Sequence, residues 1–132
     1  MKYEIGIGII DAKQNDIPHP FNYNNPRNNN TICLVGFTPF VKGNAKYGSG
    51  CKEIKQGDKV NVIVDLQSNP HTFCLAINKL IQPFCVKLIP NRVKFILLFG
   101  EKDGEWEFNS LEELAQGIDL SKIEERKCFK YE

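Results

Sequence analysis

The side chains that could bind a metal or a cofactor are few and scattered. The only two histidines, His19 and His71, lie far apart in the chain, and neither belongs to a cluster of several metal-ligating residues. The fragment Gly6-Ile7-Gly8 belongs to an expected strand, whereas a phosphate-binding glycine motif lies where a strand turns into a helix. We therefore expect neither a metal site nor a cofactor.

Nucleophilic and acid–base chemistry have only weak candidates. A cysteine and a histidine can pair without being adjacent in sequence. Cys74 and Cys85, however, fall within apolar runs, which favours inert burial. Glu105 and Glu107 share one face of an expected hairpin strand, an arrangement more typical of a solvated surface than of acid–base catalysis. We expect the protein not to be an enzyme.

The cysteines also indicate the redox compartment. They are Cys33, Cys51, Cys74, Cys85 and Cys128, an odd number without any Cys-x-x-Cys pair. Reduced, mostly buried thiols in a cytoplasmic protein explain this pattern best. We expect all five to be free, with no designated partner for the two that lie in strands.

Aromatic side chains and an arginine on irregular segments are the candidates for binding. Residues 11–31 lose all periodicity and are rich in proline and asparagine, which is typical of a functional or disordered loop, although the asparagine run is also explained by base composition alone. Such side chains often anchor interfaces, but they can equally plug the ends of a sheet sandwich. The protein-binding candidates are Phe21, Tyr23, Arg27, Phe40 and Tyr47.

Composition limits the classes of partner. The chain has 132 residues, enough for one domain with its own core, and its 17 basic and 16 acidic side chains give a net charge of +1. That balance provides no field to attract nucleic acid or an anionic membrane. No apolar run approaches the roughly 18 residues of a membrane span, and the N-terminus does not have the pattern of a signal peptide.

Hydrophobic residues at every second position predict an antiparallel β structure. The alternation is clearest between Gly57 and Phe99, where turn residues such as Ser68-Asn69-Pro70 and Asn78-Lys79 separate the apolar runs. Short strands with turn chemistry between them favour a two-sheet sandwich, with further strands at residues 3–10 and 31–37. The expected core consists of Val62, Val64, Phe73, Leu75, Val93, Phe95 and Leu97.

The C-terminal part should differ from the sandwich, which we place at about residues 1–108. Asp103-Gly104 predicts a hairpin over residues 100–108. Ser110 and Glu113 form a capping box, which predicts a short helix within residues 109–132. Ser121 and Glu124 could cap a second short turn. Residues 127–132 alternate again and could form an edge strand.

Three motifs in this pattern resemble the SPRY (B30.2-like) family, over about residues 1–108. They are the strand opened by Gly57-Asp58, the strand closed by Asn78-Lys79, and Ile5-Gly6-Ile7. Lys79 stands where the family usually has glycine, so that turn should be made differently, and the strands that precede the Ile-Gly-Ile element in the family have no counterpart. The resemblance implies a concanavalin/SPRY-like sandwich that recognises a protein or peptide, as an adaptor or as a substrate-binding part of a ubiquitin-ligase assembly.

A second family shares the architecture. His19-Pro20-Phe21 and Asn25-Pro26-Arg27 resemble the galectin pattern His-x-Asn-x-Arg. The spacing of the histidine and arginine differs, and the Trp-Gly-x-Glu motif is absent, since the only tryptophan is Trp106. A carbohydrate-binding lectin is therefore the alternative function.

The first strand raises a question of pairing. Residues 1–10 open the chain with an apolar alternating strand whose glycines let a neighbour pack closely. An unpaired edge of this kind is a template for another strand, so we expect it to be covered. The cover could be the tail segment 128–131 or a second copy of the chain, which would make a homodimer through an edge strand.

Overall fold

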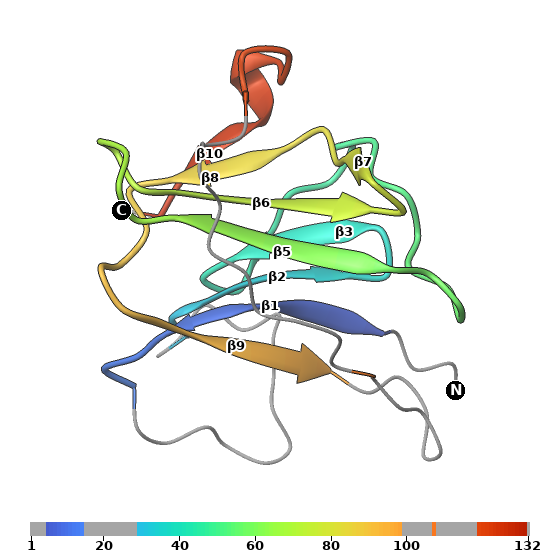
Figure 1. The fold of residues 1–132 in the computed structure, drawn as a ribbon, viewed down its shortest axis with the longest axis horizontal. Helices are drawn as coiled ribbons and strands as arrows, with labels where there is room; N and C mark the ends of the chain where they lie inside the picture. The colour runs from blue at the N-terminus through green and yellow to red at the C-terminus, as the bar shows by residue number, and fades with distance from the viewer. Residues whose placement is uncertain (1–4, 15–28, 99–106, 108–118, 132) are drawn as a thin grey trace.

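The computed structural model describes residues 5–14, 29–98, 107 and 119–131. Within these ranges the chain forms ten strands and one short 3₁₀ helix (Figure 1). The strands are β1 (Gly6–Asp11), β2 (Thr31–Val35), β3 (Thr38–Val41), β4 (Asn44–Ala45), β5 (Val60–Asp65), β6 (Thr72–Ile77), β7 (Leu80–Ile81), β8 (Cys85–Lys87), β9 (Val93–Leu98) and β10 (Cys128–Lys130), and the 3₁₀ helix η1 is Glu125–Lys127.

The strands form two sheets. One has the order β4-β3-β2-β1-β9 and is antiparallel throughout. The other has the order β10-β8-β6-β5, with β7 also paired to β6, and only its β10–β8 pair is parallel. Figure 1 shows the strands of both sheets crossing the molecule in similar directions. The expectation of a mostly β protein with two sheets is thus confirmed.

The two sheets share one hydrophobic core, which gives a β-sandwich-like architecture. On β6 the side chains of Phe73, Leu75 and Ile77 are fully buried, as their spacing of two predicts. They meet Ile7 and Ile9 from β1 in a single cluster. The other buried members of this cluster are Ile32, Leu34, Val41, Ile54, Phe84, Val86, Ile89 and Tyr131.

Strand β1 lies inside its sheet rather than at an edge. It pairs with β2 on one side and with β9 on the other, so the expectation that its edge is covered is confirmed. Neither expected cover is correct, because the covering strand is β9 and the C-terminal segment lies in the other sheet. The tail does form an edge strand, β10.

The predicted core is correct on β6 and wrong for Phe95 and Leu97 on β9. Phe95 is 53% exposed and Leu97 is 42% exposed. They pair with Ile9 and Ile7, so they share the face of two buried residues. However, β9 is the outermost strand of its sheet, and strand alternation cannot tell an edge from the interior. Val62, Val64 and Val93 are partly buried and pack against the core cluster.

The C-terminal helix expected from Ser110 and the hairpin expected over residues 100–108 lie outside the described residues, apart from residue 107. Within the described part, η1 is the one helical element. Glu124 occupies its N-cap position but makes no capping hydrogen bond through its side chain. Its carboxylate instead accepts a hydrogen bond from Arg126.

Two of the motif residues, Asp58 and Asn78, lock neighbouring turns together. The Asp58 carboxylate accepts hydrogen bonds from Lys52 Nζ at 2.7 Å, from the Lys55 backbone N–H at 2.8 Å and from Asn78 Nδ2 at 2.9 Å. The side-chain Oδ1 of Asn78 accepts a hydrogen bond from the Lys59 backbone N–H. Asn78 and Lys79 both take left-handed φ angles, of 51° and 72°, as the two central residues of a tight hairpin turn do.

The Asp58 contacts predict an acid-sensitive contribution to stability. The hydrogen bond from Lys52, with those from Lys55 and Asn78, lowers the pKa of Asp58 to about 2. Because the pKa is depressed on folding, the stabilisation is present above about pH 4 and is lost as the pH falls toward 2. We expect Asp58→Asn to cost about 1 kcal/mol near neutral pH, since solvent screens the half-exposed Lys52.

Urea denaturation of the wild type and of Asp58→Asn, at about pH 6 and about pH 2.5, measures this contribution. The difference in unfolding free energy should shrink at the lower pH. A difference that stays constant between the two pH values would show that the charge of Asp58 does not contribute.

Candidate functional site

The structure places two of the five sequence-predicted site residues. Tyr47 follows β4 in a loop and is 83% exposed, as a binding residue should be. Phe40 is not a loop residue but lies on β3, where only 7% of it is exposed, so its prediction as a contact residue is wrong. It packs with Cys33 and Val35 on the face of the sheet that points away from the main core. Phe21, Tyr23 and Arg27 lie outside the described residues.

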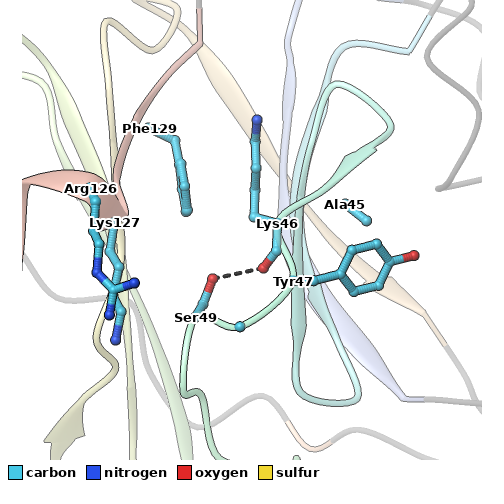
Figure 2. A pocket seen from close by; sticks show the side chains of 8 residues that line it. Ala45, Lys46, Tyr47, Ser49, Arg126, Lys127 and Phe129 are labelled. Carbon is cyan, nitrogen blue, oxygen red and sulfur yellow. Dashed lines mark hydrogen bonds between the residues drawn. The ribbon is translucent and has the colours of Figure 1, made fainter.

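Tyr47 borders an open pocket of about 400 Å³ between two distant parts of the chain (Figure 2). One side is the end of β4 and the loop after it, residues 45–49. The other side is the end of η1 and the start of β10, with Arg126, Lys127 and Phe129. Figure 2 shows Lys46 and Phe129 facing each other across this opening, with Arg126 and Lys127 on the C-terminal side.

The loop side of the pocket is fixed by its own backbone. The Lys46 N–H donates to the Pro39 carbonyl oxygen at 2.8 Å, which ties the loop to β3. The buried Ser49 hydroxyl donates to the Lys46 carbonyl oxygen at 2.7 Å. Gly48 between them has a φ of 75°, a left-handed conformation that glycine adopts without strain. The loop is therefore held in a defined shape that leaves the Tyr47 ring outside.

The C-terminal side of the pocket is anchored on the core. Strand β10 pairs with β8, and the Phe129 ring lies 6.5 Å from the ring of Phe84, which is fully buried. The Lys127 N–H donates to the Glu124 carbonyl oxygen at 2.8 Å and closes η1. Both sides thus offer side chains on a supported backbone, and such preorganisation lowers the entropic cost of binding.

The charge around the pocket is predominantly positive. Lys46 Nζ lies 5.3 Å from the centre of the Phe129 ring, a cation–π contact. Glu124 pairs with Arg126 through Nε and lies 3.9 Å from Lys127 Nζ. The Arg126 guanidinium, with a smaller effect of Lys127, lowers the pKa of Glu124. The charged side chains that line the pocket are therefore all cations, namely Lys46, Arg126 and Lys127, whereas the carboxylates Glu124 and Glu125 precede Arg126 in the chain.

These groups are suited to binding and less to catalysis. The residues that line the pocket include no histidine, cysteine or carboxylate, and the Ser49 hydroxyl is directed to a backbone carbonyl. Guanidinium and ammonium groups beside aromatic rings can hold an acidic group and pack against the chain that carries it. Among the described residues, no three potential metal ligands gather in one place. The same part of the chain contains no helix that is long and apolar enough to cross a bilayer.

Sequence reasoning found Tyr47 but missed the cations and Phe129. Residues 124–127 form a charged run, Glu-Glu-Arg-Lys, and Phe129 belongs to the alternating tail that follows it. The sequence therefore indicated exposed charges next to an apolar strand. What the sequence could not supply was the parallel pairing of β10 with β8. That pairing brings the tail beside residues 45–49.

Comparison of the chain with protein-family models, with curated proteins and with solved structures finds no match in any of the three. The arrangement of the pocket is therefore what bears on function.

Proposed function

We propose that the protein is a non-catalytic recognition module that binds an acidic peptide segment of another protein. The observation that carries the proposal is the pocket between residues 45–49 and 126–129, whose lining combines three cations with the aromatic side chains of Tyr47 and Phe129. The SPRY resemblance points the same way, because domains of that family act as adaptors that recognise proteins or peptides.

The charges of the site select the chemistry of the partner. Glu124 neutralises only part of the positive charge of Arg126 and Lys127, and Lys46 has a ring rather than a carboxylate beside it. An Asp or Glu side chain, or a C-terminal carboxylate, would meet donors that are already in place. The exposed Tyr47 ring offers apolar surface for the neighbouring residue of the peptide.

A fixed two-sheet framework with a supported loop suits this function. The hydrogen bond from Asn78 to Asp58 joins two of the motifs on which the SPRY resemblance rests. These two polar side chains therefore stabilise the framework. A module of this kind would act in the cytoplasm as an adaptor. A role in a ubiquitin-ligase assembly is a narrower form of the same proposal. The alternative, a galectin-like lectin, rests on residues 19–27, which lie outside the described part of the chain.

Selection from a random peptide library, followed by titration of the selected peptides, tests the proposal. We expect enrichment of Asp and Glu, with binding that weakens as salt is raised. Tyr47→Ala and Arg126→Ala should each weaken binding about tenfold, because each removes one anchoring contact.

Two matched controls separate this site from exposed surface in general. Phe37→Ala removes another exposed aromatic ring, in the turn between β2 and β3, and Lys94→Ala removes an exposed cation on β9. Neither change should affect binding. Selected peptides without acidic residues, or equal losses in the controls, would contradict the proposal. A glycan array run in parallel would support the lectin instead if it gave ligands whose binding the pocket variants do not alter.

A further inference from the structure

The parallel pairing of β10 with β8 places two cysteines directly opposite each other. Cys128 is the register partner of Cys85, and their sulfur atoms lie 3.2 Å apart, although the residues are 43 positions apart in sequence. All five cysteines are free thiols in the structure. The sequence had suggested no partner for Cys85, because the sheet pairing that supplies one cannot be read from strand alternation.

The backbone already satisfies the geometry that a disulfide needs. Neighbouring strands lie about 4.8 Å apart, which is within the roughly 4.4–6.8 Å range of Cα separations in disulfides. Register partners on adjacent strands also direct their side chains to the same face of the sheet. The thiol of Cys85 donates a hydrogen bond to the sulfur of Cys128, so the two side chains already point at each other.

The two thiols differ in access, which gives them different roles. Cys128 is partly exposed on the outermost strand, whereas Cys85 is fully buried. Burial, with the contact to Cys128, raises the pKa of Cys85 to about 12. Cys85 is therefore a protonated thiol at neutral pH, and Cys128 is the thiol that a soluble oxidant reaches first. Cys33 and Cys74 are buried too, and neither donates or accepts a hydrogen bond with a cysteine sulfur in the described structure.

We propose that Cys85 and Cys128 form an oxidant-sensitive disulfide that ties the C-terminal strand β10 to β8. With hydrogen peroxide as the oxidant, the Cys128 sulfur gives up its proton and attacks one peroxide oxygen. The O–O bond breaks and the departing hydroxide takes that proton to leave as water, so Cys128 becomes a sulfenic acid. The Cys85 sulfur then attacks the Cys128 sulfur. The S–S bond forms, the S–O bond breaks, and the departing hydroxide takes the Cys85 proton to leave as water. Two thiols and one peroxide thus give one disulfide and two waters.

The disulfide would act on a functional part of the surface. Cys128 lies between Lys127 and Phe129, which both line the pocket shown in Figure 2. The disulfide would keep β10, and with it Lys127 and Phe129, bound to β8 when the hydrogen bonds between the two strands break. The disulfide itself does not depend on the peptide-binding proposal, because it follows from the strand register and the sulfur positions alone.

Treatment of the folded, reduced 132-residue chain with hydrogen peroxide, followed by unfolding, alkylation of the remaining thiols and peptide mass spectrometry, tests the proposal. We expect a peptide linked through Cys85 and Cys128, with two of the five thiols protected from alkylation. The oxidised protein should melt about 10 °C higher than the reduced form, because the link closes a long loop of the unfolded chain. A thiol reductant should reverse both changes.

Two variants make the test specific. Cys128→Ser should lose the linked peptide and the melting shift, whereas Cys33→Ala, which removes a buried cysteine on β2, should keep both. Free alkylation of Cys85 and Cys128 after oxidation of the folded wild type would overturn the proposal. So would a link that forms only after unfolding, or a Cys128 that is converted to sulfinic acid or pairs with Cys51. The wild-type experiment decides the matter even if a variant fails to fold.

Discussion

Phe73→Ala is expected to lower the unfolding free energy by about 3–5 kcal/mol, the range measured for large-to-small changes in well-packed cores. Phe73 is fully buried on β6, between the two neighbours with which that strand pairs, β5 and β8. Its ring lies 6.3 Å from the ring of Phe84, which is also fully buried. Truncation would leave a cavity that β6 cannot close, because strand pairing holds it on both sides.

The matched control is Phe95→Ala, the same chemical change on β9. The sequence pattern assigns Phe95 to the core, where the same large loss would be expected. The structure corrects this, since the ring is 53% exposed, and we now expect a loss below about 1 kcal/mol. Urea denaturation of both variants measures the difference. Equal losses of unfolding free energy at the two positions would mean that the Phe95 ring is buried in solution. The exposed position of this ring on β9 would then be contradicted.

The two phenylalanines show how far strand alternation reaches. The alternating apolar runs on either side of Ser68-Asn69-Pro70 predict two strands, and β5 and β6 occupy these runs. On β9 the predicted face was also correct, because Phe95 pairs with the buried Ile9. Burial was not predictable, since it depends on how many strands lie beside β9 and on what covers them. Alternation reports the two faces of a strand and says nothing about its position in the sheet.

The pairing of distant strands is the second thing that the sequence could not supply. The first strand was expected to be covered by the tail or by a second copy, whereas β9 covers it and the tail extends the other sheet. Each of these strands offers unpaired backbone groups of the same kind, so local pattern does not decide among them. The pocket depends on the same information, because residues 45–49 and 126–129 meet only once β10 has joined β8. Tyr47 was recognisable alone as an exposed aromatic, but its charged neighbours were not.

Gly8→Ala is the other substitution from which we expect a large loss, at or above roughly 3 kcal/mol, the upper part of the range for overpacking. Gly8 lies in the middle of β1, the strand that pairs on both sides, opposite Cys33 of β2. A Cβ at this position would overlap the carbonyl oxygen of Ile32 and would lie 2.6 Å from Cα of Cys33. Both are backbone atoms of a paired strand, so neither can move away without breaking the ladder between β1 and β2.

Gly6→Ala on the same strand is the matched control for this loss. The nearest atom to a Cβ at Gly6 is Cδ1 of Leu98 at 2.9 Å, the end of a flexible side chain on the outermost strand. Because that side chain can rotate, we expect a loss of about 1–2 kcal/mol, the lower part of the overpacking range. Thermal and urea denaturation of the two variants give the comparison. If Gly8→Ala proved as stable as Gly6→Ala, the close approach of β2 to β1 at this point would be wrong. The register that places Gly8 opposite Cys33, and with it the position of β1 inside the sheet, would then have to be revised.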